Sequence, residues 1–283
     1  MTSRATARLV LVAAGVAMAL GGPATDTAQA GALLPERGGS PNADRIASLY
    51  TVILVLAAIV FFGVAVSLVF ALVRYRERRS PVAAQIRGHT RLEIGWTVAA
   101  TALVVFIAVF SLTKLGAIEH PDRADASPAA AVAAGLGDHG DAALHIDVVG
   151  RRYVWMFKYP NGAYSYEQMV APVGVTVELD IVSVDVAHSW WIPKLGGKFD
   201  AIPGYVNHTW FKIPTSALKP GQKQVVYHGQ CAELCGRNHA NMYGNVIGMR
   251  YADWKRWYDE KAREIQQAKN AAAAERKQRE GTQ

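Results

Sequence analysis

The sequence predicts a hairpin of two transmembrane helices followed by an all-β sandwich. Two stretches without a charged residue, 51–73 and 94–113, lie in the first half of the chain. Each is long enough to cross about 30 Å of hydrocarbon as a helix. The second half contains short segments of alternating or β-branched residues, separated by Gly and Pro turns, which is typical of a sandwich or barrel. The 283 residues, 51% of them hydrophobic, suffice for the spans and one domain.

Residues 1–30 have the pattern of a secretory signal peptide. Arg4 and Arg8 precede an apolar core over 9–20, which is too short to span a bilayer, and Ala28-Gln29-Ala30 fits a small-residue cleavage site. We therefore expect export with cleavage after Ala30. An uncleaved short anchor is the alternative.

Residues 31–117 are predicted to form the hairpin, preceded by a short polar segment. The loop between the two spans is rich in arginine, and short arginine-rich loops stay on the cytoplasmic side. Its basic residues, counted with those flanking it, are Arg74, Arg76, Arg78, Arg79, Arg87 and Arg91. Both ends of the hairpin, and everything after residue 114, are therefore expected outside the cytoplasm.

The net charge of +7 does not indicate a nucleic-acid partner. Residues 1–117 carry +6, residues 118–250 carry −1 and residues 251–283 carry +2. The positive excess thus lies beside the membrane segments and in the tail, where it suits lipid contact.

The rest of the chain divides by composition into three parts. Residues 118–144, rich in Ala, Gly, Asp and Pro, indicate a flexible linker. Residues 145–251 form the predicted β domain, and residues 252–283 a charged C-terminal helix or tail in which Trp254, Trp257 and Tyr258 pack back on the domain. The predicted strands are 145–149, 153–159, 175–184, 205–213, 223–228 and 245–251.

The only two cysteines of the chain, Cys231 and Cys235, lie in one short segment with His239 and Met242. Thiolate, thioether and imidazole are soft ligands that favour copper. A disulfide is the alternative, since an exported protein with two cysteines often forms one. A disulfide, however, requires neither the nearby histidine and methionine nor the upstream His188.

Two thiolates, two imidazoles and one thioether exceed what a single copper ion normally takes. They suit two copper ions bridged by both sulfurs, each with one histidine. With one ligand early in the β domain and the others in a late loop, a cupredoxin-like sandwich is the expected frame.

The pattern Cys-x-Glu-x-Cys-Gly-x-x-His-x-x-Met, with an upstream Asp-Val-x-His-Ser, resembles the binuclear copper (CuA) site of cytochrome c oxidase subunit 2. The resemblance implies that Cys231 and Cys235 bridge the two coppers and that His188 and His239 are the terminal ligands. Met242 is then a weak axial ligand. The family positions present are His188, Cys231, Glu233, Cys235, His239 and Met242.

Glu233 has two roles under this resemblance. Its backbone carbonyl is the second axial copper ligand, and its carboxylate reaches a magnesium ion shared with subunit 1. The motif Lys198–Asn207 also resembles a family loop that faces subunit 1, with Tyr205 in place of the usual arginine.

Four further residues are functional candidates through the same resemblance. Tyr153 occupies the position of the family tryptophan that receives the electron, and Trp155 matches a second aromatic. Asp185 resembles an acid that contributes to docking, with a solvated strand-end charge as the alternative. Glu93, in a Glu-x-x-Trp-Thr pattern, matches a glutamate near the mouth of a proton-uptake path, and a simple helix-start carboxylate is the alternative.

The resemblance implies an electron-accepting subunit of a proton-translocating cytochrome c oxidase in a bacterial cell membrane, with the copper domain on the periplasmic face. Cytochrome c is the implied donor, and subunit 1, among other oxidase subunits, carries the haem and the oxygen-reducing site. No Cys-x-x-Cys-His motif follows, so an appended haem c domain is not expected. The alternatives are a membrane-tethered copper-binding or copper-delivery protein and a disulfide-stapled structural domain.

Overall fold

The structure is a computed structural model that describes residues 34–76, 85, 87–121 and 143–280. The predicted signal peptide, most of the arginine-rich loop and most of the predicted linker lie outside these residues. They therefore stay predictions.

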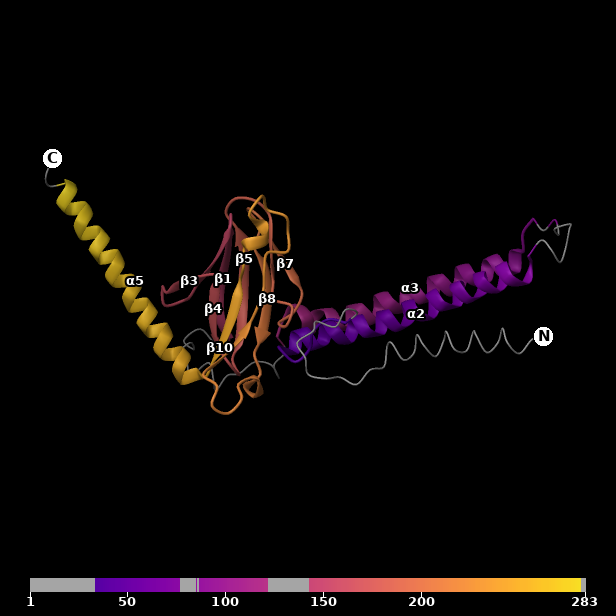
Figure 1. Ribbon diagram of the computed structural model, residues 1–283, viewed down its shortest axis with the longest axis horizontal. Helices are drawn as coiled ribbons and strands as arrows, with labels where there is room; N and C mark the ends of the chain where they lie inside the picture. The colour runs from indigo at the N-terminus through magenta and orange to yellow at the C-terminus, as the bar shows by residue number, and fades with distance from the viewer. Residues whose placement is uncertain (1–33, 77–84, 86, 122–142, 281–283) are drawn as a thin grey trace. The chain divides into compact units, whose positions relative to one another are not determined.

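Two long helices make up the first half of the described chain (Figure 1). Helix α2 spans Pro41–Arg74 and helix α3 spans Thr90–Glu119. They pack against each other, and both are long and apolar enough to cross a membrane. Each extends beyond the uncharged stretch that predicted it. Pro41 explains the early start of α2, because proline at the first helical position has its φ already set for a helix.

Within the described residues 143–280, ten strands form three sheets. Figure 1 shows them between the two long helices and α5 in the chain's colour order. The five-stranded sheet has the order β3-β2-β1-β5-β8, the three-stranded sheet the order β4-β10-β9, and β6 pairs with β7. The strands are β1 Ala143–Arg151, β2 Val154–Lys158, β3 Tyr164–Tyr166, β4 Gln168–Pro172, β5 Thr176–Ser183, β6 His188–Trp191, β7 Lys198–Ala201, β8 Asn207–Lys212, β9 Gln224–Tyr227 and β10 Asn245–Met249.

The core lies between the two larger sheets. In β5, buried residues alternate with partly exposed ones along most of the strand, as the period of two requires. Leu144, Leu179 and Ile181 from the larger sheet join Met169 and Val246 from the smaller one in a single buried cluster. The predicted β-sandwich is therefore confirmed.

Each of the six predicted strands overlaps an observed strand, namely β1, β2, β5, β8, β9 and β10. Strands β3, β4, β6 and β7, of three to five residues each, were not predicted. Two short 3-10 helices complete the domain, Thr215–Ala217 and His239–Asn241.

Helix α5 spans Tyr251–Glu280 and begins directly after the last strand. Trp254 is fully buried, its indole Nε1 donates to the Val170 oxygen at 3.2 Å, and its ring stacks on Tyr258 with centroids 4.7 Å apart. Trp257 packs edge-on against Tyr159. The expected packing of these aromatic residues on the domain is confirmed.

Candidate metal centre

The loop between β9 and β10 carries most of the donor atoms. Its two ends are joined by a bridge between Gln230 and Tyr243, and the Cys231 backbone N–H donates to the Met242 oxygen at 2.9 Å. His188 opens the neighbouring strand β6. The Ala232 N–H donates to the oxygen of the residue after His188 at 2.9 Å, so the loop and this strand are fixed to each other.

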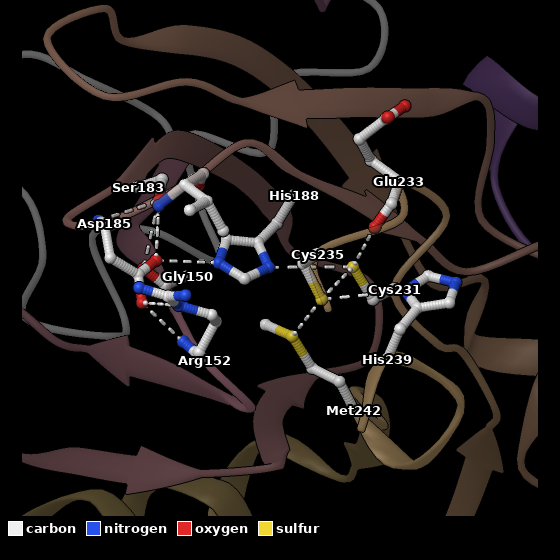
Figure 2. Close-up of polar contacts among 11 residues, drawn as sticks. Gly150, Arg152, Ser183, Asp185, His188, Cys231, Glu233, Cys235, His239 and Met242 are labelled. Carbon is white, nitrogen blue, oxygen red and sulfur yellow. Dashed lines mark hydrogen bonds and ion pairs between the residues drawn. The ribbon is translucent and has the colours of Figure 1, made fainter. Parts of the chain in front are cut away.

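The side chains converge on a pair of sulfur atoms (Figure 2). The Sγ atoms of Cys231 and Cys235 are 3.9 Å apart. His188 Nδ1 lies 3.8 Å from the Cys231 sulfur, and His239 Nδ1 lies 3.6 Å from the Cys235 sulfur. The Met242 sulfur is 3.9 Å from that of Cys235. Each cysteine thus has its own imidazole, and the thioether lies beside one of them.

The sulfur pair is buried and not bonded. Cys231 and Cys235 are free cysteines with 2% and 5% of their surface exposed. Their separation of 3.9 Å is far beyond the roughly 2.05 Å of a disulfide. Among the residues that the structure describes, Cys231, Cys235 and His188 form a group able to hold a metal, with donor atoms within 4.8 Å of one another.

The two thiols differ in acidity. Burial by itself raises the pKa of Cys231, but hydrogen bonds with His188 and with the backbone outweigh it and lower that pKa. Burial and the negative charge of Cys231 raise the pKa of Cys235. Only thiolates bind metals strongly, so both thiols must lose their protons when the site is filled, and a cation supplies the compensating charge.

Asp185 orients His188. One of its carboxylate oxygens lies 2.9 Å from His188 Nε2, and the other accepts from the Arg152 backbone N–H at 2.8 Å. Ring nitrogens that face away from a metal are usually held in this way, which fixes the tautomer and aims the other nitrogen at the metal. From the sequence, Asp185 was expected only to contribute to docking or to be a solvated charge. The Asp-x-x-His spacing was the signal that could have revealed this contact.

The candidate aromatic residues lie on either side of the loop. Tyr153 is half-buried against Gly236, where an added Cβ atom would lie 2.6 Å from the tyrosine hydroxyl. Trp155 is fully buried, so a docked protein would not touch it. Its ring packs edge-on against His188 with centroids 5.8 Å apart. Of the two, only Tyr153 reaches the surface beside the loop.

Glu233 and Glu93 lie in different surroundings. The Glu233 carbonyl oxygen accepts from the Cys231 thiol at 3.2 Å, whereas its exposed carboxylate points away from the sulfurs (Figure 2). Glu93 lies in the first turn of α3, where its carboxylate accepts from the backbone N–H of His89, the residue that caps the helix, at 3.1 Å. The Glu233 carbonyl therefore lies beside the sulfur pair, and Glu93 is remote from it in the chain.

Comparison with known families accounts for both halves of the chain. The family "Cytochrome C oxidase subunit II, transmembrane domain" matches residues 28–114, and "Cytochrome C oxidase subunit II, periplasmic domain" matches residues 164–248. The cytochrome c oxidase subunit 2 of Alkalihalophilus pseudofirmus is 33% identical over 235 residues, 81% of this chain. The chain spans 61% of the length of that relative.

A second relative is covered more completely. The cytochrome c oxidase subunit 2 of Synechocystis is 31% identical over 234 residues, which are 72% of this chain and 68% of the relative. A crystal structure of the periplasmic domain of subunit II of cytochrome oxidase from Bradyrhizobium japonicum matches 43% of this chain and 94% of its own, with 28% identity and a TM-score of 0.39. The two family matches and the Synechocystis relative show that this chain belongs to the cytochrome c oxidase subunit 2 family.

Proposed function

We propose that the chain is the electron-accepting subunit of a respiratory cytochrome c oxidase and holds two copper ions in the loop between β9 and β10. The electron comes from a cytochrome c and leaves for haem in subunit 1, where oxygen is reduced and protons are pumped. The observation that carries the proposal is the pair of buried sulfurs, Cys231 and Cys235, each with a different imidazole Nδ1 within 3.8 Å.

The donor set fits a copper pair. The thiolates of Cys231 and Cys235 and the imidazoles of His188 and His239 would hold the ions, with Met242 and the Glu233 carbonyl as weaker ligands. Bound copper supplies one-electron chemistry, with the charge change spread over two ions. His188, Cys231, Cys235 and Met242 are buried, and backbone hydrogen bonds fix the loop, so little would need to move when the charge changes.

The face that bears Glu233 is proposed to meet subunit 1. The outward carboxylate of Glu233 is free to share a magnesium ion with that subunit, since carboxylate oxygens are ligands that Mg²⁺ prefers. Apolar side chains are exposed both on the loop between β9 and β10, here called the copper loop, and on the segment after β7. Leu234 is 78% exposed, Tyr205 59% and Ile202 40%. Apolar surface of this kind is typical of a contact with another subunit.

The remaining assignments concern the membrane. Helices α2 and α3 would cross the cell membrane of a bacterium, with the metal centre on the periplasmic side. Glu93 would then lie at the cytoplasmic end of α3, where a carboxylate can take up protons for subunit 1. Its hydrogen bond to the helix-capping residue equally suits a structural role, and replacement by Gln would separate the two.

A copper-delivery protein is the competing function. Delivery requires an accessible metal and few ligands, whereas these cysteines are almost fully buried and six donor positions converge. Purification discriminates between the two. The subunit should co-purify with a large haem-bearing chain, and a delivery protein should not.

The test is electron paramagnetic resonance of the full-length chain in detergent, loaded with copper and oxidised. We expect hyperfine structure from one unpaired electron shared by two copper nuclei. Cys235→Ser should abolish the sharing of the unpaired electron between two copper nuclei. His228→Ala is the matched control, since this exposed histidine near the loop bonds to Asn245 and should leave the spectrum unchanged. A signal from a single copper nucleus in the unmodified chain would refute the proposal.

A further inference from the structure

Three arginines are chain neighbours of the two residues that meet where Tyr153 packs on the copper loop. Arg151 and Arg152 directly precede Tyr153, and Arg237 directly follows Gly236, against which the tyrosine packs. All three arginines are exposed. Neither Arg151 nor Arg237 forms an ion pair within the described part of the chain.

The nearby carboxylates offset this charge only in part. Asp185 accepts from the Arg152 backbone, contacts His188 and pairs with the Arg152 guanidinium at 3.4 Å, so it offsets Arg152 and leaves Arg151 and Arg237. Glu233 points to the opposite side of the sulfur pair from Arg152 (Figure 2). The next acid, Glu167, is exposed beyond Trp155, to whose oxygen its backbone N–H donates. Even with Asp185 and Glu167 counted, the surface around Tyr153 stays positive.

The rest of the domain is negatively charged. Residues 118–250 together carry −1, and without Arg151, Arg152 and Arg237 they carry −4. Fields between exposed charges fade beyond about 8–10 Å at physiological salt, so the arginines next to the contact surface dominate what an approaching protein senses.

We propose that the electron donor of this chain is a small redox protein with an acidic face around its exposed redox group, and that Arg151 and Arg237 guide it to Tyr153. This inference rests on the proposed function. In each encounter the donor loses one electron and the centre gains it, and no atom or proton is transferred. Tyr153 is a contact residue here, because its ring lies against the loop next to Cys235.

Charge complementarity of this kind acts mainly on the rate of association. Steering raises association rates by about 10- to 1,000-fold and weakens steeply as salt increases. Reversing two of three arginines should therefore lower the second-order rate constant for an acidic donor by at least about ten-fold at low salt. It should change the rate at saturating donor much less.

The test uses the intact oxidase complex that contains the chain. Oxygen consumption is measured with an acidic soluble cytochrome c, a basic one and a small uncharged phenylenediamine reductant, over a range of ionic strength. The variant Arg151→Glu/Arg237→Glu is compared with Lys223→Glu. Lys223 is a matched control because it is exposed and precedes Gln224, which pairs with Met249 at the end of β10 away from the copper loop. Arg152 is left unchanged, since it contacts Asp185.

We expect the acidic cytochrome to be the faster donor at low salt and its advantage to disappear as salt rises. The double variant should reverse the preference, whereas Lys223→Glu and the rate with the uncharged reductant should stay as in the unmodified complex. A faster basic donor, or a double variant that leaves both rates unchanged, would overturn the inference. A complex without the shared-copper signal, or inactive with the uncharged reductant, would instead count against the proposed function.

Discussion

The contact between Tyr153 and Gly236 gives a sharp test of how the copper loop is held. Gly236 has φ of +132°, a conformation that residues with a side chain rarely adopt. A Cβ atom at this position would also lie 2.6 Å from the Tyr153 hydroxyl and 3.3 Å from two ring carbons. Gly236→Ala therefore introduces a backbone strain and a collision with one identified atom.

The two costs can be separated. Backbone strain of this kind costs about 1–3 kcal/mol, and overpacking costs about 1–3 kcal/mol more. Tyr153→Phe removes the atom at 2.6 Å and leaves the milder contacts at 3.3 Å. We therefore expect Gly236→Ala to be less damaging when it is combined with Tyr153→Phe, by about 1–2 kcal/mol, or about 5- to 30-fold in an equilibrium constant.

The assay is competition for copper between the full-length chain and a chelator, together with the thermal unfolding midpoint of the loaded chain. Four forms are compared: the unmodified chain, the two single variants and the double variant. Gly162→Ala is the matched control, because Gly162 has φ of +82° but open space around its added Cβ. Equal effects of Gly236→Ala with and without the tyrosine hydroxyl would refute the packing of Tyr153 on the loop.

Three further predictions concern the domain around the centre. Gly150→Ala should loosen copper binding several-fold in the same competition assay, because the added Cβ would lie 3.0 Å from a ring carbon of His188. Trp254→Ala should destabilise the domain by about 3–5 kcal/mol, measured by denaturant unfolding, and should expose α5 to limited proteolysis; an unchanged cleavage pattern would contradict it. Burial raises the pKa of Tyr159 above that of the unfolded chain, so this residue contributes stability that is full below about pH 10 and is lost as pH rises further. The free energy of unfolding of Tyr159→Phe should thus fall less steeply with rising pH than that of the unmodified chain. At pH 7 the substitution should cost about 1–3 kcal/mol, because the hydrogen bonds to Val170 are lost.

Local sequence patterns predicted the elements that have strong periodicity. The uncharged stretches marked α2 and α3, and the alternation of residues 175–184 marked β5. The pattern could not reveal that β5 pairs with β1 in parallel or that β4 pairs with β10 in parallel, because these contacts join residues far apart in the chain. The break between β3 and β4 lies at Glu167, whose φ is +59°. Neither hydropathy nor turn residues signalled this break.

The metal centre was predictable to a different degree for each residue. The spacing of Cys231, Cys235, His239 and Met242 predicted that one loop gathers them, and their side chains do converge on the sulfur pair (Figure 2). The sequence alone did not show which side chain supports His188, because that depends on how β6 leaves the preceding loop. Asp185 was therefore placed at the surface, although the structure places its carboxylate behind the imidazole.

Hydrogen bonds between the copper loop and strand β6 limit movement of the donor residues. Cys231 is bonded through its backbone to Met242, and the next residue, Ala232, to strand β6 directly after His188. Cys231, Met242 and the strand that carries His188 thus belong to one hydrogen-bonded unit. A displacement of one imidazole would have to strain both the strand and the loop, which a close-packed interior resists. In the proposed function each electron changes the charge of the centre, so a frame that resists displacement would keep the rearrangement per electron small. The fully buried Trp155 also packs against the His188 ring and so restricts its movement.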